Sequence, residues 1–416
     1  MPDYPSRTQR ILSRIEQLAA ISEDPDGTTV TRTFGTPAFV RGRDLVQSWF
    51  EAAGLKVHLD GIGNLRGRWA SQRPGAKTFV LASHIDTVVN AGKYDGPLGV
   101  IMALNLVESL MEQGSTLPFN LELIAFSDEE GVRFHTTYLG SKVVTGAFDP
   151  ATLLRTDAQG ITLAQAIADM GGNAAQLATD ALPPTEWLGY FELHIEQGPV
   201  LWESGVPVAL VTALAGQQRV ELTWQGMAGH AGTVPMAMRQ DALAAAAEFI
   251  LAAEAFALHH GQRLVATVGQ LRIPYSASNV IPGQVVHSLD LRSPDAGQLA
   301  TAYADLQARA EAIATRRDVA LDWQLIQATA PVTCDPELNR LLGQAIAASG
   351  HEVVGLVSGA GHDAVPISAV APATMAFIRC YKGISHNPLE NVEPADVAAA
   401  LEVAEGFLHR LITAHS

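Results

Sequence analysis

The fold is decided by the stretch LASHIDTVVNAGKYDGPLGV, residues 81–100. An apolar run ends there in His84 and Asp86, a loop containing Asp95 follows, and a Gly-Pro pair then opens a pattern with helical spacing. A strand that leads through such a loop into a helix is typical of an α/β sheet. Residues two apart in an extended chain point to the same side, so His84 and Asp86 are expected to face one space.

Outward from this stretch, strands and helices alternate along most of the chain. Strands are expected at 56–60, 79–82, 120–126, 190–196, 353–357 and 374–378. Asp335-Pro336 predicts the start of a helix, since aspartate caps a helix and proline fits its first turn. Further helices are expected from about His362 and from Pro394. The pattern predicts a doubly wound α/β domain with a central, mostly parallel sheet.

The stretch 212–327 follows a different order. Its pattern predicts strand 218–225, helix 241–258, strand 263–273, strand 284–292, helix 295–314 and strand 319–327. The order β-α-β-β-α-β is the split βαβ pattern of a small α+β sandwich. The sequence therefore predicts a catalytic domain of residues 1–211 and 328–416, with residues 212–327 inserted into it.

Composition narrows the class of protein. The 416 residues include 27 Lys plus Arg against 43 Asp plus Glu, a formal charge of −16, and 48% are hydrophobic. A folded chain this acidic repels phosphate, so neither nucleic acid nor an anionic membrane is expected as its partner. The apolar stretch 242–258 is interrupted by two glutamates and is expected to be a helix of a folded domain. With only two cysteines, the expected compartment is the cytoplasm.

Histidines and acids also follow the other predicted strands. Asp128-Glu129-Glu130 ends strand 120–126, His194 lies on the polar face of strand 190–196, and His386 lies in a loop after the last strand. Each alone has an ordinary explanation, such as a solvated acidic loop or a hydrogen-bonded histidine. Together with His84, Asp86 and Asp95 they form a nitrogen and oxygen donor set at the ligand-binding edge of the sheet, which suits Zn²⁺, Mn²⁺ or Co²⁺.

Competing motifs are weak or missing. The sequence has no H-E-x-x-H and no G-x-S-x-G. Residues 359–364, GAGHDA, fit the dinucleotide pattern G-x-G-x-x-A, but no acid stands about 20 residues later to bind a ribose. A tight turn that presents backbone groups to a substrate is the preferred interpretation of this segment.

The ordered set of motifs resembles the dinuclear metallohydrolases that include aminoacylases and zinc carboxypeptidases, and most closely the branch that acts on ureido compounds. The resemblance spans nearly the whole chain, through GHAGTVPMAMRQDAL, SASNVIPG, LDLR, SGAGHDA and GISHNP. It implies a hydrolase that cleaves a ureido C–N bond in a small carboxylate. The segments EEGVRFHTTYLGS and FIRCYKGISHNP are more similar to allantoate amidohydrolases than to N-carbamoyl-L-amino acid hydrolases. The two groups of enzymes share every metal position.

The resemblance also implies roles for individual residues. Two divalent ions per subunit are expected, zinc or manganese with cobalt possible, held by His84, Asp95, Glu130, His194 and His386 with Asp95 bridging. Glu129 would take a proton from the attacking water and Asp86 would orient His84. The substrate would be held by Gln197, Gly359, Ala360, Asn279 and Arg292. The inserted domain would act as lid and dimerisation domain of a homodimer, with His230 reaching the partner's site.

Two positions depart from the family pattern. Trp202 stands where an acid is usual after GPVL, and Gln218 stands where a threonine is usual. Neither is a metal position, but both weaken the choice of allantoate over an N-carbamoyl-L-amino acid or β-ureidopropionate. The remote alternative is a catalytically silent paralogue that only binds its ligand. Such a protein would lack some of the metal-ligating residues.

Overall fold

The computed structural model describes residues 3–416, except for the side chain of Gln262. The chain divides into two compact units: Met1–Thr212 with Cys334–Ser416, and Ala213–Thr333. The sequence predicts the second boundary at 327, but strand β13 continues to Thr329, and β14 (Val332–Thr333), at the end of the second unit, already pairs with β6 (Val208–Leu214) in the nine-stranded sheet.

The first unit is built around a nine-stranded sheet, and its four central strands run parallel in the order β4-β3-β5-β16. Antiparallel strands β1 and β2 extend one edge, and β6 and β14 extend the other, with β15 paired to β6. The strands are β1 (Lys56–Leu59), β2 (Leu65–Trp69), β3 (Thr78–His84), β4 (Asn120–Phe126), β5 (Trp187–Ile195), β6 (Val208–Leu214), β15 (Gly355–Ser358) and β16 (Ala373–Ile378).

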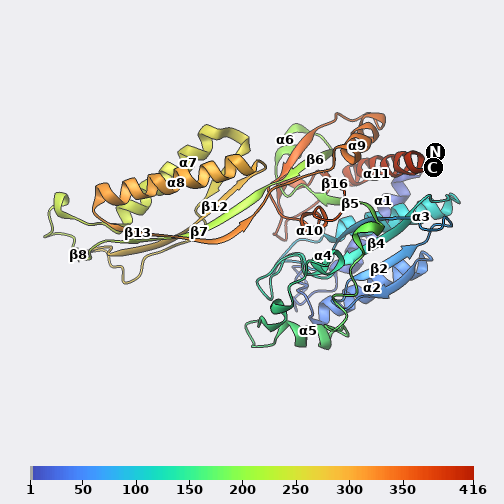
Figure 1. Ribbon diagram of the computed structural model, residues 1–416, viewed down its shortest axis with the longest axis horizontal. Coiled ribbons are helices and arrows are strands. Elements are labelled where there is room, and N and C mark those ends of the chain that lie inside the picture. Colours follow the sequence, from blue (N-terminus) through green and yellow to red (C-terminus); the bar gives the residue numbers. More distant parts are fainter. Residues whose placement is uncertain (1–2) are drawn as a thin grey trace. The chain divides into compact units, whose positions relative to one another are not determined.

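Helices lie on both faces of this sheet (Figure 1). Phe191 of β5 packs against Phe407 of α11, with ring centroids 4.7 Å apart. His194, on the opposite face of the same strand, contacts the ring of His362, just before α10. The helices are α1 (Tyr4–Ala19), α2 (Pro37–Ala52), α3 (Pro97–Glu112), α4 (Leu139–Thr145), α5 (Leu163–Asp169), α6 (Val200–Ser204), α9 (Pro336–Ala348), α10 (Ala364–Ile367) and α11 (Pro394–His415). The predicted doubly wound α/β domain is confirmed.

Local sequence signals explain where these helices begin. Asp335 accepts hydrogen bonds from the backbone N–H groups of Glu337 and Leu338, as an N-cap should. Helix α3 begins at Pro97, after Gly96 at φ 83°. The helix expected from about His362 is only the four residues of α10.

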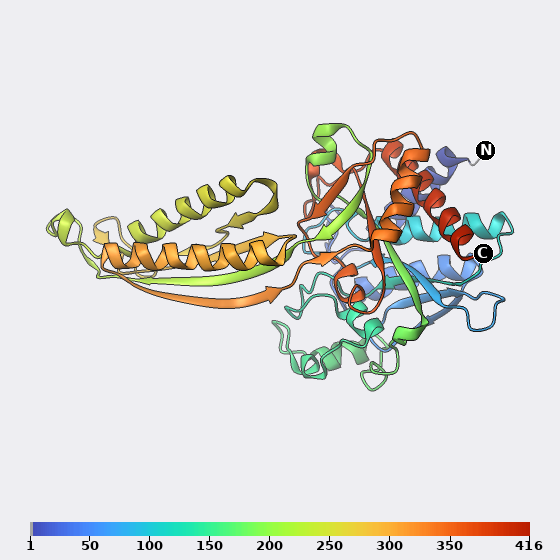
Figure 2. The same cartoon turned by 45° about the horizontal axis from the view of Figure 1, so that its top comes forward.

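The second unit is an antiparallel sheet with two helices on one face (Figure 2). Its strand order is β10-β12-β7-β13, with β9 also paired to β12. The elements are β7 (Gly216–Gln225), β8 (Gly229–His230), α7 (Ala242–His260), β9 (Val265–Thr267), β10 (Leu271–Arg272), β11 (Val280–Ile281), β12 (Gln284–Ser293), α8 (Ala296–Arg317) and β13 (Ala320–Thr329). The β-α-β-β-α-β order is as predicted, but the single strand expected at 263–273 is broken in two. The break lies at residues 268–270, where Ser288 Oγ of β12 accepts the N–H of Gln270 in place of a backbone carbonyl.

Helix α7 is long and apolar enough to cross a membrane by length and composition. In the structure its buried side chains, among them Phe249 and Phe256, pack into the core of the second unit with Trp224 and Leu291. Packing in this unit therefore accounts for one face of α7, whereas Leu251 and Leu258 of the same helix are exposed.

Candidate metal centre

The centre begins with His84, the last residue of the fully buried strand β3. Its Nδ1 lies 3.1 Å from the backbone oxygen of Asp86 and 3.3 Å from Asp86 Oδ1. Nδ1–H therefore donates to Asp86, and the lone pair of Nε2 is directed away from it. The loop after β3 needs a glycine at Gly96, because a Cβ there would collide with the His84 ring.

Asp95 lies between two sets of donors. Its Oδ1 is 3.1 Å from His194 Nε2 and 3.8 Å from His84 Nε2. Its Oδ2 is 3.1 Å from His386 Nε2, which is in turn 3.4 Å from Glu130 Oε1. The two oxygens of one carboxylate thus face two different histidine groups, which is the arrangement of a bridging ligand.

Asp86 also positions the acidic loop that follows β4. The backbone N–H groups of Glu129 and Glu130 donate to Asp86 Oδ1 and Oδ2 at 3.0 and 3.1 Å. One carboxylate therefore fixes both His84 and the backbone of the two glutamates. Ligand atoms of His84, Glu129 and Glu130 lie within 4.8 Å of one another.

Charge in this centre is unbalanced. Burial, and then the neighbouring Glu130 carboxylate, raise the pKa of Glu129 well above its usual value. Burial would also raise the pKa of Asp95, but hydrogen bonds from His194 and His386 lower it well below the usual range. Hydrogen bonds to Asp95 and Glu130 raise the pKa of His386 to about 10. The protein without metal therefore holds protons on its histidines to offset the carboxylates.

A divalent cation fits these residues. His194 Nδ1 lies 2.9 Å from the backbone oxygen of Ile195, so its proton is used there. Its Nε2 is buried and faces Asp95 Oδ1 at 3.1 Å. Two lone pairs directed at each other require a proton or a cation between them. Imidazole nitrogens and carboxylate oxygens without thiolates suit zinc, manganese or cobalt.

Gln197 contacts the centre directly, and the 359–360 segment precedes His362, whose ring contacts His194. Gln197 has φ 59°, a strained value for a residue with a side chain, and its Nε2 donates to Asp95 Oδ2 at 2.8 Å. Its Oε1 is buried without a partner among the described residues, so it is available as an acceptor. Ala360, next to Gly359, accepts a hydrogen bond at its carbonyl from Ser358 Oγ, which fixes the turn.

Three predicted site residues belong to the second unit, which is described by itself. His230 pairs with Val280 in the short β8–β11 ladder, and its side chain is exposed. Asn279 accepts the N–H of Ala231 at its backbone oxygen. Arg292 forms an ion pair with Asp290 at 2.9 Å.

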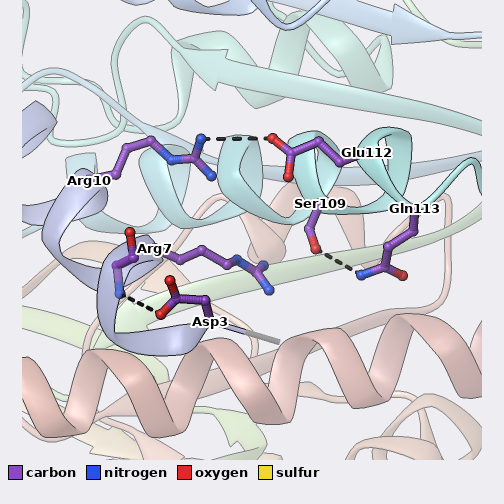
Figure 3. Close-up of a pocket in the computed structure, with 7 residues that line it drawn as sticks. Asp3, Arg7, Arg10, Ser109, Glu112 and Gln113 are labelled. Carbon is purple, nitrogen blue, oxygen red and sulfur yellow. Dashed lines mark hydrogen bonds and ion pairs between the residues drawn. The ribbon is translucent and has the colours of Figure 1, made fainter. Parts of the chain in front are cut away.

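A separate cavity of about 410 Å³ lies at α1 and α3 (Figure 3). Arg10 pairs with Glu112 in it, and Gln113 Nε2 donates to Ser109 Oγ. Its charges are balanced, and it contains none of the predicted site residues. The centre around Asp95 is therefore the better candidate for chemistry.

Sequence reasoning missed several polar residues of the centre. Ser385 and Glu390 flank His386 in the GISHNPLE segment, and both contact the loop that bears Asp95. Glu192 is fully buried and accepts from Tyr190 and Ser83. An acid in a loop has no periodic pattern, so only its unusual burial identifies Glu390.

The pattern of Peptidase family M20/M25/M40 matches residues 80–410. The chain belongs to this family. It is 38% identical to allantoate deiminase 1 of Glycine max, over 96% of this chain and 89% of the relative. It is 39% identical to an N-carbamoyl-L-amino acid amidohydrolase of Geobacillus stearothermophilus, over 95% and 96% of the two chains.

Solved structures agree with the sequences. A hydantoinase/carbamoylase family amidase of Burkholderia multivorans superposes with a TM-score of 0.90 at 32% identity, covering 97% of each chain. The predicted resemblance is confirmed. The M20 family is metal-dependent, and this member is an amidohydrolase that acts on non-peptide C–N bonds.

Proposed function

We propose that this M20 enzyme hydrolyses a ureido C–N bond in a small carboxylate, with allantoate as its substrate. The products would be ureidoglycine, ammonia and carbon dioxide. One observation carries the proposal: Asp95 faces two donor groups, and Glu129 lies beside them with its backbone fixed by Asp86. The likeness to a plant allantoate deiminase supports the choice of substrate.

The donor groups divide into two metal positions. His84, Asp95 and His194 would hold one divalent ion, and Asp95, Glu130 and His386 the other. Bound ions of this kind lower the pKa of a water and polarise a carbonyl. Zinc or manganese is the expected occupant, with cobalt as a substitute.

Glu129 would serve as general base. Its side chain reaches the same space as His84 and Glu130, but it belongs to neither of the two donor groups that share Asp95. Burial beside Glu130 raises its pKa, which suits a group that takes a proton from water and returns it to the leaving nitrogen. Asp86 would act on the chemistry only by positioning His84 and the glutamates.

Substrate would be held by groups from both units. The free oxygen of Gln197 can accept from a ureido N–H, and the Gly359 and Ala360 backbone would complete that contact. Asn279 and Arg292 would bind the carboxylate, the arginine through its planar fork. His230 would stabilise the oxyanion in a partner subunit's site, which makes a homodimer through the inserted domain part of the proposal.

An N-carbamoyl-L-amino acid is the alternative substrate. The likeness to the Geobacillus enzyme supports it equally well by identity. Trp202 weakens the choice of allantoate, because it stands where the family tends to have an acid; its ring packs on Tyr381, with 4.9 Å between the centroids.

A substrate panel tests the proposal. The metal-loaded enzyme is assayed for ammonia release with allantoate, ureidoglycolate, several N-carbamoyl-L-amino acids, β-ureidopropionate and N-acetyl-amino acids. The highest kcat/KM is expected for allantoate. A higher value for an N-carbamoyl-L-amino acid would select the alternative, and activity restricted to N-acetyl-amino acids would refute ureido hydrolysis.

A further inference from the structure

The proposed metal ligands are held in place to very different degrees. The side chains of His84 and His194 are only 2% and 1% exposed, and both lie on fully buried stretches of central strands. The side chain of His386 is 48% exposed and lies in a loop with φ 53°. Packing fixes the first two histidines, so the loop itself must fix the third.

Glu390 joins this loop to the loop that bears Asp95. It follows His386 by four residues and is only 3% exposed. Its Oε1 accepts the backbone N–H groups of Tyr94 and Asp95 at 2.7 and 3.1 Å. Its Oε2 accepts from Ser385 Oγ at 3.1 Å. One buried carboxylate therefore contacts the backbone of one proposed ligand and the neighbour of another.

Ser385 completes the connection. Its hydroxyl lies 2.8 Å from Asp95 Oδ2, the oxygen that faces His386, and it has only one proton to share between Asp95 and Glu390. The turn after His386 is closed by the N–H of Glu390, which donates to the Asn387 oxygen at 3.0 Å.

The Glu390 side chain also fills a tight space. A Cβ placed on Gly92 would collide with it, so the backbone of the Asp95 loop passes directly against this side chain. Shortening Glu390 would remove both the hydrogen-bond acceptors and this packing contact. The distance between Asp95 and His386 would then lose its main constraint.

We propose that Glu390, acting with Ser385, is a positioning residue that sets the spacing of Asp95 and His386 and thereby the affinity of the Asp95–Glu130–His386 metal position. The inference rests on the proposed function for the identity of that position. It assigns no contact between Glu390 and metal or substrate. Mutation of a residue that hydrogen-bonds a metal ligand typically lowers metal affinity by ~10–100-fold. A loss of affinity of this size is expected when Glu390 is shortened.

The test is binding of Mn²⁺ alone to metal-free protein, followed by the EPR signal of the free ion. Wild type is expected to show two classes of position, and His386→Ala to identify the class that depends on His386. Glu390→Ala should weaken that class ~10–100-fold and leave the other within a few-fold. Ser385→Ala should weaken the same class less.

Controls separate positioning from general structure. Glu390→Gln keeps an oxygen for Tyr94 and Asp95 and should bind Mn²⁺ nearly as wild type does. Glu393→Ala removes an exposed acid in the same segment and should change neither class. The melting temperature of each metal-free variant is measured alongside.

Unchanged binding by Glu390→Ala would overturn the inference, and so would equal weakening of both classes that Glu390→Gln fails to restore. A wild-type protein that binds no Mn²⁺ or Zn²⁺ would instead refute the proposed function. A wild type that binds two ions but hydrolyses no ureido compound would refute the proposed reaction and leave the Glu390 assignment standing.

Discussion

Changing the adjacent glutamates Glu129 and Glu130 to glutamine, one at a time, should have different effects on turnover and metal content. Glu129 lies outside both proposed metal groups, and its backbone is fixed by Asp86 and by Tyr138, whose N–H donates to the Glu129 oxygen at 3.0 Å. The amide is nearly the same size, so Glu129→Gln should keep metal and substrate binding and lose only proton transfer. General-base help contributes ~10²–10⁴-fold, or about 3–5 kcal/mol of activation free energy.

Glu130 has a different environment, because its Oε1 lies 3.4 Å from His386 Nε2. Glu130→Gln replaces one anionic donor of a three-residue group by a neutral one and should lower metal content as well as kcat. The assay combines ammonia release with metal analysis of protein reconstituted in Mn²⁺, and exposed Glu186→Gln is the matched control. Near wild-type turnover by Glu129→Gln, or loss of metal equal to that of Glu130→Gln, would refute the assignment of the base.

Three further predictions follow from the structure. Asp95 and Glu130 raise the pKa of His386 to about 10, so Mn²⁺ binding at pH 7 should release protons, seen as a dependence of calorimetric heat on the buffer's ionisation enthalpy. Burial lowers the pKa of His287 from 6.5, so the stability that its neutral ring contributes is complete above that pH and is lost as the pH falls below it. Urea unfolding followed by tryptophan fluorescence should show this dependence on pH, and His287→Gln should remove it. Mixing inactive His230→Ala with inactive Glu129→Gln under verified subunit exchange should restore partial ammonia release, and no recovery would mean that His230 acts within its own chain or not at all.

Residues on regular strands could be predicted from the sequence alone. The two-residue spacing of His84 and Asp86 predicts a shared side, and the structure places Asp86 Oδ1 3.3 Å from the histidine ring. Alternation along 190–196 likewise predicts that His194 turns away from the apolar face, as its contact with His362 shows. Buried strands follow a period of two, so their side-chain directions are encoded locally.

Loop residues could not be predicted in this way. The sequence offers His386 as a candidate donor, but the position of its ring depends on contact with Asp95, almost 300 positions earlier in the chain, which no local pattern predicts. Glu196 directly follows β5 and alternates with His194, but its carboxylate accepts the N–H groups of Val200 and Leu201 at the start of α6 instead of joining the centre. The alternation along a strand predicts the direction of a side chain. Its hydrogen-bond partner depends on the path of the chain after the strand.

The same distinction explains how the centre is assembled. Parallel strands β3 and β5 are neighbours, so their ends bring His84 and His194 together as a consequence of the sheet, with ring centroids 5.7 Å apart. No such geometry brings the His386 loop to Asp95, and buried hydrogen bonds through Ser385 and Glu390 do so instead. Substitutions in the strands should therefore affect folding before metal binding, whereas substitutions in the 385–390 loop should affect one metal position in a protein that still folds.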